Sequence, residues 1–519
     1  MPNDTNISNK VRIELVPLGA IFEVERGTLL QGLLSSHGME FPCGGLGTCG
    51  GCRVQVLEGH VEPTPEEQDL LPREELLEGW RMACYIRAET PLKLKIEQWT
   101  MPILVDDTHL AHTRRTGLAI AIDLGTTTIV AQLLDLATGK LLGFRTALNP
   151  QAVQGADVMS RVRFAFSSNE LTPLIQNFLG DMVHDLASGR EAEVEEIVLV
   201  GNTVMHHLFC GIDTEPLSHV PFASPKLGEQ RFTPAQLNWH FPESAVIRFL
   251  PCIGGFVGAD ILAGIVAVGL HTSDKLRALI DLGTNGEISL GNRDRILCAS
   301  TAAGSAFEAG SIKMGMRAST GAISRVFLNG HGNGKGMECM VVGDSEPRGI
   351  CGSGLVDAVA AGLNADIIAP RGRFNNGSKE FPLAGIVKLW QSDVRELQLA
   401  KAAIASGMRI LLDRWGASID EVEEVYLSGA FGNYVRAESA IRIGLLETSV
   451  DRLTAAGNTA LRGAKMLIGA ESFPVLDMIE HVGLASDPNF QDRFVDCMAF
   501  PDAETAASRE ARVEETAAV

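Results

Sequence analysis

Apolar and polar residues alternate in short runs over the first hundred residues, which predicts β-strands separated by helical stretches. The expected strands cover residues 11–15, 21–24, 53–57 and 81–87, and the expected helices cover 29–36 and 65–79. Thr28 can cap the first helix, and Gly38 can end it. This order describes a small α+β domain, which we place at residues 1–97.

From residue 118 onward, longer apolar runs predict the buried strands of a larger α/β part. Before them, residues 98–116 show no clear periodicity and gather polar residues, so we interpret them as a linker. The last 19 residues hold five acidic and two basic residues among alanines, which predicts a disordered tail or a frayed helix. We therefore divide the rest of the chain into a first half, 117–272, a second half, 273–500, and a tail, 501–519.

Four cysteines of the small domain are grouped three-plus-one. Cys43, Cys49 and Cys52 are separated by five and then two residues, and Cys84 follows later. This grouping is typical of a [2Fe–2S] cluster, and the glycines between the cysteines let backbone N–H groups turn toward the cluster sulfurs. A zinc site is the alternative, because C-x2-C also suits a tetrahedral metal. A zinc ribbon usually has two such pairs, and this stretch has one, so we favour iron–sulfur.

A second chemistry begins at the end of the first buried strand of the larger part. The turn Asp123-Leu124-Gly125-Thr126-Thr127-Thr128 lies between two apolar runs, and Asp281-Leu282-Gly283-Thr284-Asn285 repeats the pattern. Such a hairpin presents N–H and hydroxyl donors to phosphate, and its aspartate can hold Mg²⁺ or its waters. Two facing hairpins would clamp the phosphates of a nucleotide. A later turn, Gly429-Ala430-Phe431-Gly432, can lie close to a base and ribose.

Several other side chains admit two interpretations. Asp260 can orient the attacking water or Mg²⁺, although the helix dipole alone also favours an aspartate at a helix N-terminus. Glu287 and Glu308 are alternative groups for positioning that water. Gly352-Ser353-Gly354 either contacts phosphate or only caps the helix that follows. The histidines at 206–207 suit a proton relay or a cobalt ligand, but we favour the simpler view that they are satisfied locally on a helix.

The composition and net charge restrict the class of protein and the kinds of partner that we expect. A chain of 519 residues is too long for a single core, and 45% hydrophobic with 6% aromatic residues describes an ordinary α/β protein. A formal net charge of −20 argues against nucleic acid as a partner, because nothing would neutralise its phosphates.

The sequence predicts a cytoplasmic protein with no membrane contact. Residues 1–10 contain no apolar signal segment, and the longest apolar run, 261–270, is too short to span a bilayer. The cysteines outside the group of four follow no disulfide spacing, which suits a reducing compartment. They are Cys210, Cys252, Cys298, Cys339, Cys351 and Cys497.

The order of these motifs resembles known families. Residues 1–97 are similar to β-grasp [2Fe–2S] ferredoxins of the adrenodoxin/putidaredoxin type, whose first cysteine gap is one residue longer than in plant-type ferredoxins. The two hairpins and the turn Ser428–Gly432 resemble the two-lobed α/β ATPases of the acetate and sugar kinase/Hsp70/actin superfamily. The whole chain therefore resembles the reductive activators of corrinoid-dependent enzymes, which fuse two such domains. Further motifs of this resemblance lie at 200–207, 255–260, 303–308, 315–318, 350–357 and 457–460.

One feature of the chain departs from that family. Some members carry a middle domain between the ferredoxin and ATPase parts. We expect only the short linker 98–116 in that place, so no role of a middle domain is carried over.

The resemblance implies the repair of an inactivated cofactor. Corrinoid methyltransferases use Co(I), which occasionally loses an electron and becomes inactive Co(II). The implied activity is ATP-dependent reduction of Co(II) to Co(I), with a [2Fe–2S] cluster, ATP and Mg²⁺ as cofactors. The implied partners are the corrinoid protein of a methyltransferase system and an electron donor such as a flavodoxin, a ferredoxin or a reductase, and a homodimer is left open. Asp123, Asp281 and Asp260 would act on ATP.

Two other functions stay open at this point. The ATPase part could be a small-molecule kinase with the ferredoxin as a redox sensor, although no sugar- or acyl-binding signature is recognisable. It could instead energise electrons for a non-corrinoid enzyme, as the activators of 2-hydroxyacyl-CoA dehydratases do. Those activators hold a [4Fe–4S] cluster at a subunit interface and lack the fused ferredoxin, and Cys339 and Cys351 offer no convincing ligand set for such a cluster.

Overall fold

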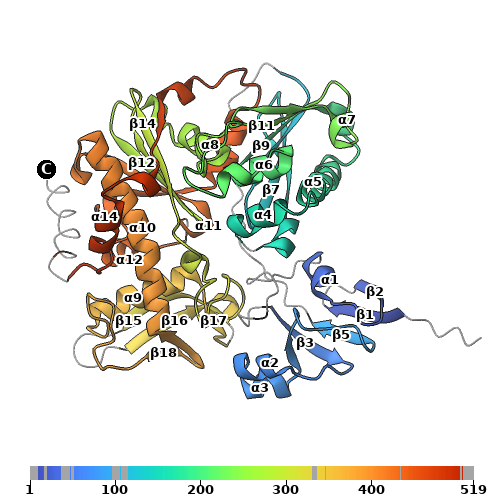
Figure 1. Ribbon diagram of the computed structural model, residues 1–519, viewed down its shortest axis with the longest axis vertical. Coiled ribbons are helices and arrows are strands. Elements are labelled where there is room, and N and C mark those ends of the chain that lie inside the picture. Colours follow the sequence, from blue (N-terminus) through green and yellow to red (C-terminus); the bar gives the residue numbers. More distant parts are fainter. Residues whose placement is uncertain are drawn as a thin grey trace, which may run out of the picture. The chain divides into compact units, whose positions relative to one another are not determined.

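The protein forms two compact units in this computed structural model (Figure 1). The first unit contains residues 1–100 and 150–161, and the second contains 101–149 and 162–519. The structure describes residues 10–16, 20–36, 47, 52–95, 106, 115–155, 157–283, 285–329, 336–344, 346–432, 434–502 and 505. No helix among these residues combines the length and the apolar character needed to cross a membrane.

The first unit is built on a five-stranded sheet in the order β2-β1-β5-β3-β4. Its strands are β1 (Lys10–Val16), β2 (Ala20–Glu25), β3 (Arg53–Glu58), β4 (Trp80–Met82) and β5 (Leu92–Lys95), and its helices are α1 (Gln31–Ser36), α2 (Pro65–Leu70) and α3 (Arg73–Leu77). The pair β1–β5 is parallel, and the other pairs are antiparallel. Val11, Ile13 and Leu15 point into the core, as the alternation predicts.

Three local predictions for this unit are corrected. The helix expected over 65–79 is two helices, because Pro72 follows Leu71, whose backbone is extended as a residue before proline prefers. The strand expected over 81–87 ends at Met82, because the N–H of Tyr85 bonds the carbonyl of Met82 at 2.9 Å and closes a turn. The central strand β5 was not predicted, because its run of alternation is only four residues long.

The second unit contains two six-stranded sheets of the same plan. In each, three consecutive antiparallel strands are extended by parallel strands beside the first of the three. One sheet, β10-β11-β9-β6-β7-β8, has β6 (Leu118–Leu124), β7 (Thr128–Asp135), β8 (Leu141–Leu148), β9 (Val194–Gly201), β10 (Gln230–Phe232) and β11 (Val246–Phe249). The other, β21-β20-β12-β13-β14-β22, has β12 (Arg277–Leu282), β13 (Gly286–Gly291), β14 (Ile296–Thr301), β20 (Glu424–Ser428), β21 (Leu453–Gly457) and β22 (Ile479–His481). This duplication agrees with the repeat in the sequence.

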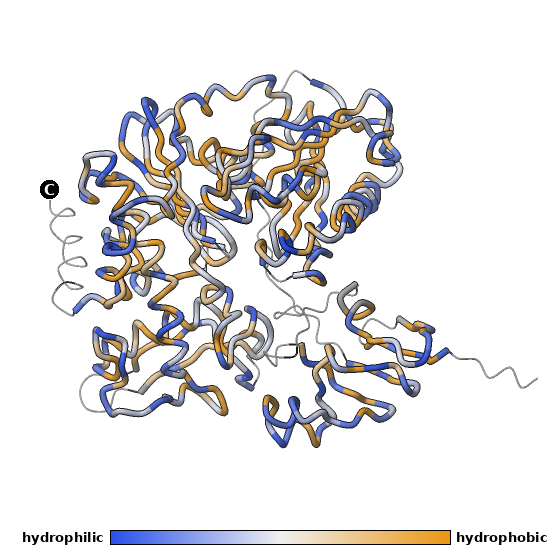
Figure 2. Tube along the Cα trace, viewed as in Figure 1, coloured by the Kyte–Doolittle hydropathy of each residue, from blue (hydrophilic) through white to orange (hydrophobic). Residues whose placement is uncertain are grey.

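Helices cover both sheets, and two small sheets complete the unit. The helices are α4 (Val158–Ala165, of which 158–161 belong to the first unit), α5 (Leu171–Ala187), α6 (Thr203–Cys210), α7 (Pro234–Leu237), α8 (Ala259–Val268), α9 (Gly352–Asn364), α10 (Gln391–Trp415), α11 (Gly429–Gly432), α12 (Ala437–Arg442), α13 (Thr459–Met466) and α14 (Phe490–Asp496). The small sheets join β15 (Ala322–Asn329), β16 (Gly336–Val341) and β17 (Gly349–Ile350), and β18 (Glu380–Ala384) with β19 (Val387–Trp390). Hydrophobic residues concentrate along the strands of both large sheets (Figure 2), and the paired strands β6, β7, β12 and β13 are almost wholly buried.

Candidate functional site

The first hairpin, between β6 and β7, is held in a tight turn. The N–H of Gly125 bonds the carbonyl of Thr128 at 3.1 Å, and a Cβ on Gly125 would lie 2.5 Å from that oxygen, so only glycine fits. Asn149 donates its side-chain amide to the carbonyl of Gly125 at 2.9 Å. Asn202 caps α6 and donates to the Thr126 hydroxyl oxygen at 2.8 Å. The turn is therefore fixed from two sides.

The second hairpin, between β12 and β13, has the same form and different supports. Asp281 lies opposite Glu287 in the antiparallel pair, and beside Ser428 of the parallel strand β20. The Ser428 hydroxyl donates to Asp281 Oδ2 at 2.6 Å. Gly429 follows with φ +81°, and a Cβ there would lie 2.7 Å from Asp281 Oδ1. Position 429 of the predicted turn therefore has to be glycine, because a larger residue would collide with the predicted aspartate.

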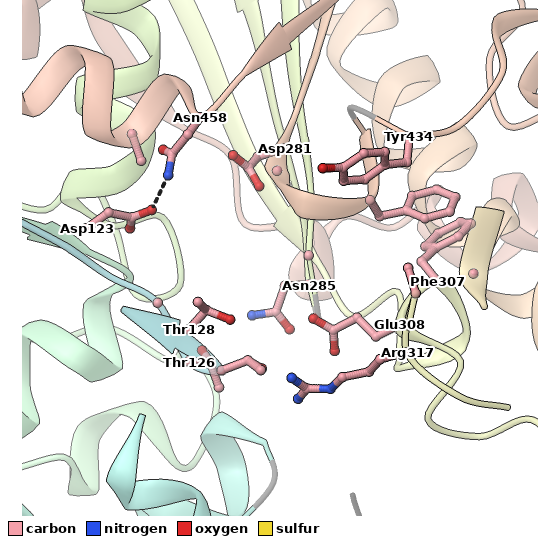
Figure 3. Close-up of a pocket in the computed structure, with 18 of the residues that line it drawn as sticks. Asp123, Thr126, Thr128, Asp281, Asn285, Phe307, Glu308, Arg317, Tyr434 and Asn458 are labelled. Carbon is pink, nitrogen blue, oxygen red and sulfur yellow. Dashed lines mark hydrogen bonds between the residues drawn. The ribbon is translucent and has the colours of Figure 1, made fainter. Parts of the chain in front are cut away.

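One pocket of the second unit collects both hairpins (Figure 3). Asp123 and Asp281 enter it from the ends of β6 and β12, and Asp260 enters it from the start of α8. Asn458, the residue before α13, donates its amide to Asp123 Oδ2 at 2.9 Å. The lining residues are Asp123, Gly125, Thr126, Thr127, Thr128, Val130, Asn202, Asp260, Asp281, Gly283, Asn285, Glu287, Phe307, Glu308, Met316, Arg317, Ala318, Cys351, Gly352, Ser353, Gly429, Phe431, Tyr434, Asn458 and Ala460.

The carboxylates of this pocket raise one another's proton affinity. Burial raises the pKa of Asp123 to about 6, the hydrogen bond from Asn458 opposes the rise, and the charge of Asp281 adds to it. Burial and then the charges of Asp281 and Asp123 raise the pKa of Asp260 to about 8. Burial, with the charges of Asp260 and Asp281, also raises the pKa of Glu287. A divalent cation among these oxygen ligands would relieve the repulsion, so the residues fit Mg²⁺.

An aromatic wall forms at another side of the pocket. Phe431 of the glycine turn stacks on Phe307, with ring centroids 4.6 Å apart, and Tyr434 lies beside them (Figure 3). The backbone of Gly352 approaches this wall so closely that a Cβ would lie 1.7 Å from the carbonyl oxygen of Phe307. A flat apolar surface close to backbone is suited to a nucleotide base.

Arg317 and Glu308 lie across the pocket from the first hairpin. Figure 3 shows the Arg317 guanidinium near the Glu308 carboxylate. Burial lowers the pKa of Arg317 to about 9. The backbone bridge between Gly315 and Ile350 fixes the segment that carries Arg317. An arginine in this place can balance the charge of a phosphate.

The structure brings most of the predicted pocket residues together. Asp123, Asp260, Asp281, Gly125, Thr126, Thr127, Gly283, Asn285, Gly429 and Phe431 all line the pocket. Gly432 does not: it lies against Leu427 and Leu282 instead. Thr284 and the side chain of Ala430 lie outside the described residues.

The open interpretations resolve in part. Glu287 and Glu308 line the pocket, and so do Gly352 and Ser353 in the first turn of α9, where the Ser353 hydroxyl donates to the carbonyl of Ser324 at 3.0 Å. The histidines at 206–207 are buried in α6, and the simpler view of local hydrogen bonding fits His207. His207 bonds the carbonyl of Thr203 at 2.8 Å and the Ser224 hydroxyl at 2.6 Å.

Sequence reasoning missed five polar or aromatic residues of the pocket. Four of them lie within motifs of the family resemblance, to which no role was assigned: Asn202, Phe307, Arg317 and Asn458. Asn202 and Asn458 each precede a helix as its N-cap, which is a signal that sequence reasoning could have used. Phe307 and Tyr434 carried no signal of a base site.

The first unit places two of the four predicted cluster cysteines close in the fold. Cys52 and Cys84 are both buried, and the bond from the Ala83 N–H to the Cys52 carbonyl joins their segments. The Tyr85 hydroxyl donates to the Gly47 carbonyl at 3.3 Å, and a Cβ on Gly47 would meet that hydroxyl at 1.9 Å, so Gly47 lies close to the segment of Cys84. Buried thiols beside a close-packed glycine fit a cluster. Cys43 and Cys49 lie outside the described residues.

The fold and the pocket define a class of protein. A duplicated α/β domain with an acidic pocket at its paired hairpins is an ATPase domain of the actin, Hsp70 and sugar-kinase type, and a β-grasp ferredoxin domain accompanies it. The predicted fold class is confirmed. Family models match both parts: a 2Fe-2S iron-sulfur cluster binding domain at residues 13–89, the RACo middle region at 118–273, and the C-terminal domain of RACo, the ASKHA domain, at 275–511.

The chain belongs to the RACo family of reductive activators of corrinoid proteins. It is 35% identical over 428 residues to the corrinoid activation enzyme RamQ of Eubacterium limosum, covering 74% of this chain and 70% of that protein. It is 27% identical over 417 residues to the [Co(II) methylated amine-specific corrinoid protein] reductase of Methanosarcina barkeri, covering 72% of this chain and 76% of that protein. A solved structure of a reductive activator for a corrinoid, iron-sulfur protein aligns with a TM-score of 0.65 and 26% identity, over 95% of this chain and 98% of that one.

These matches correct one expectation about the middle of the chain. We expected only the linker 98–116 in place of a middle domain, but the RACo middle region matches residues 118–273. The chain therefore has this region, and it coincides with the β6–β7 hairpin and the sheet around it. Its hairpin has the same Asp-Leu-Gly-Thr pattern as the hairpin of the second half.

Proposed function

We propose that this chain is an ATP-hydrolysing iron–sulfur reductase that converts the inactive Co(II) form of a corrinoid protein to Co(I), ready for methyl transfer. The observation that carries the proposal is the convergence of Asp123, Asp260 and Asp281 in one pocket of a chain that also has a ferredoxin domain. A simple electron carrier needs no nucleotide pocket. A pocket of this kind in the same chain couples electron delivery to ATP.

Cys43, Cys49, Cys52 and Cys84 would hold a [2Fe–2S] cluster, which the match to a 2Fe-2S domain supports. When bound, the cluster supplies the one electron that changes Co(II) to Co(I). The burial of Cys52 and Cys84 keeps water from their thiolates. We assign residues 1–97 to this domain and 98–116 to the linker, 117–272 and 273–500 to the two halves of the ATPase part, and 501–519 to a tail.

Different residues of the pocket would bind the metal ion, the phosphates and the base of ATP. Asp123 and Asp281 would hold Mg²⁺ or its waters, and Asp260 would orient the attacking water. The predicted phosphate donors are Gly125, Thr126, Thr127, Gly283, Thr284 and Asn285. The turn from Gly429 to Gly432, with Phe431 stacked on Phe307, would receive the base and ribose.

ATP assists a reduction only through differential binding. One nucleotide state must bind the corrinoid protein more tightly when its Co(II) has lost a lower ligand and is easier to reduce. Each 1.4 kcal/mol of this preference shifts the population about tenfold, so a few kcal/mol is enough. Movement of the two halves around the pocket would supply it.

The partners follow from this chemistry. The electron donor would be a reduced flavodoxin, a ferredoxin or a reductase, because each delivers single electrons at low potential. Outside the cluster group, the cysteines of the chain are free thiols, which suits the reducing cytoplasm where we place the protein. They are Cys210, Cys252, Cys298, Cys339, Cys351 and Cys497. A homodimer stays a prediction.

One experiment separates this function from the kinase alternative. Purified protein is mixed with a strong reductant, Mg·ATP and a Co(II) corrinoid protein, while the Co(I) absorbance band and the fate of the γ-phosphate are followed. We expect Co(I) together with inorganic phosphate. Absence of Co(I), with the phosphate transferred to a metabolite, would establish the kinase instead. A Cys49→Ser variant that still reduces cobalt would overturn the electron route.

A further inference from the structure

A buried lysine of the second unit holds one residue of the predicted linker. Lys465, on the last turn of α13, has a side chain only 1% exposed, and its Nζ lies 2.5 Å from Asp106 Oδ2. The same Nζ donates to the Asp106 carbonyl at 2.8 Å, and the buried Gln132 of β7 donates to that carbonyl at 2.9 Å. Taking a lysine out of water is costly, so a partnered lysine at this depth fixes the position of Asp106.

A second contact fixes the end of the linker to the loop that follows α13. Arg115 donates to Glu196 Oε2 at 2.7 Å, and the N–H of Gly469 donates to both Glu196 oxygens at 3.1 Å. Arg248 completes the group: it donates to Glu196 Oε1 at 2.6 Å and to the carbonyl of Ala470 at 2.6 Å. Glu196 and Arg248 are both buried. Asp106 and Arg115 are thus both attached to α13 or to the residues just after it.

The other end of α13 lies in the nucleotide pocket. Asn458 is the N-cap of this helix: its Oδ1 accepts from the N–H of Leu461 at 2.8 Å, and its Nδ2 donates to Asp123 Oδ2 at 2.9 Å (Figure 3). One side chain therefore joins the start of the helix to a carboxylate that we assign to Mg²⁺.

Between these two ends, α13 is packed too closely to bend. A Cβ on Gly463 would lie 1.9 Å from the carbonyl oxygen of Ala263 on α8, and one on Gly264 would lie 2.8 Å from Leu279 and 3.1 Å from the Thr459 hydroxyl. The two helix backbones are in direct contact, and α8 itself starts with Asp260 in the pocket. A displacement at the pocket end of this pair must move the far end as well.

We propose that α13 couples the nucleotide pocket to the linker, with Asn458 responding to the nucleotide and Lys465 holding Asp106. The proposal rests on the proposed function in one respect, that the pocket binds Mg·ATP. Asp123 Oδ2 accepts from Asn458, and the same carboxylate would be required by the metal ion or its waters. Binding of Mg·ATP changes the hydrogen bond to Asn458, α13 shifts with α8, and the hold of Lys465 on Asp106 changes.

The position of Asp106 limits where the ferredoxin domain can reach. Lys95 is the last residue of β5, and 11 peptide links separate it from Asp106. A chain of that length spans at most about 40 Å. A change in the contact between Lys465 and Asp106 therefore changes the region that the cluster cysteines can reach. Lys465, Asp106 and Asn458 are positioning residues in this account.

The test compares nucleotide binding with exchange at the linker in the full-length holoprotein. Hydrogen–deuterium exchange of peptides that contain Asp106 and Arg115 is measured with and without Mg·ATP, and the affinity for ATP is measured in parallel. In the wild-type protein we expect exchange at Asp106 to differ between the two conditions. In Lys465→Met, which keeps the length of the side chain and removes its charge, we expect that difference to vanish.

The coupling between ATP binding and the contact of Lys465 with Asp106 must act in both directions. This gives a second measurement, which a purely structural role of Lys465 would leave unchanged. If ATP changes the hold on Asp106, loss of that hold must change the affinity for ATP by the same factor, about fivefold or more for a typical coupling. Lys401→Met is the matched control, because Lys401 is also a buried helical lysine, with its Nζ 2.5 Å from the carbonyl of Ala499. It should leave both the affinity and the exchange difference unchanged. Asp106→Asn should repeat the effect of Lys465→Met.

The outcomes are distinct. If the wild-type protein does not bind ATP, the proposed function fails and the coupling fails with it. If ATP binds but exchange at Asp106 is the same with and without it, the function survives and the coupling is overturned. Equal effects of Lys465→Met and Lys401→Met on the affinity for ATP would also overturn it, since they would show only the cost of removing a buried lysine.

Discussion

The two hairpins of the pocket share a sequence pattern and a strand geometry, but their surroundings differ. Opposite Asp123 stands Val130, whereas opposite Asp281 stands Glu287. Asp123 is bonded by Asn458, the cap of a helix, and Asp281 is bonded by Ser428, at the end of a strand. The repeat thus supplies two equivalent carboxylates. The neighbouring residues differ: Glu287 gives the second hairpin an additional carboxyl group, whereas Asn458 connects the first hairpin to α13 and, through it, to the linker.

The largest effects should come from the aspartates themselves. Asp123→Asn and Asp281→Asn each remove a carboxylate from the metal site, and we expect ATP hydrolysis to slow by about 100- to 1,000-fold in both. Steady-state phosphate release measures this rate. A severe loss in one variant with near-normal activity in the other would break the equivalence of the two hairpins.

Low pH should lower the folding stability of the region around the first hairpin. Burial lowers the pKa values of His206 and His207 to about 4, and both lie on α6, whose cap Asn202 bonds Thr126. Because the folded state holds these rings neutral, their contribution to stability is present above pH 6.5 and is lost as the pH falls toward 4. Between pH 7 and pH 5 the loss is about 2 kcal/mol for each histidine.

Thermal unfolding at these two pH values checks the loss. A double variant, His206→Gln with His207→Gln, should show a smaller drop in stability between them. His240→Gln, at an exposed histidine of the same half, should show the full drop. An unchanged drop in the double variant would assign the acid sensitivity elsewhere.

The extra carboxylate of the second hairpin should affect the metal requirement. Glu287→Gln keeps the shape of the side chain and removes a carboxyl group that can ionise beside a bound Mg²⁺, near Asp260 and Asp281. We expect the Mg²⁺ concentration for half-maximal hydrolysis to rise about tenfold, which corresponds to about 1.4 kcal/mol. A titration of ATPase activity with Mg²⁺ measures it. Val130→Ala, at the equivalent position of the first hairpin, should leave this concentration unchanged.

The smallest effect should come from the hydroxyl that supports Asp281. Ser428→Ala removes the 2.6 Å hydrogen bond to Oδ2. One such bond is worth about 1 kcal/mol net, so ATP binding should weaken about fivefold. Equilibrium binding of ATP checks the value. Hydrogen exchange at Asp106 should still respond to Mg·ATP in this variant, because the substitution changes no residue of α13. Loss of that response would contradict the claim that only the first hairpin is connected to the linker.

The sequence predicted the parts of this pocket that lie next to one another along the chain. Each Asp-Leu-Gly-Thr turn carries its own strand, carboxylate and glycine, so local pattern was enough. Asn458, Arg317 and Phe307 come from distant elements, and only the packing of both sheets brings them to the hairpins. Their positions depend on tertiary contacts that no short pattern contains.

The same limit applies to the ferredoxin domain. The cysteine spacing indicated a cluster, and the alternation at 11–15 predicted β1. The break at Pro72 was missed because a long acidic stretch resembles a single helix, and the turn after Met82 was missed because the apolar run 82–86 resembles a continuing strand. The presence of a middle region was not predicted for another reason: its hairpin has the same pattern as the second.

The most direct test of the central claim is cobalt reduction in the presence and absence of nucleotide. The protein is reduced beforehand, excess reductant is removed, and a Co(II) corrinoid protein is added with Mg·ATP, without nucleotide, or with Asp281→Asn in place of the wild type. We predict that the Co(I) absorbance band appears only with wild-type protein and Mg·ATP. A Co(I) yield that is the same without nucleotide would contradict the account.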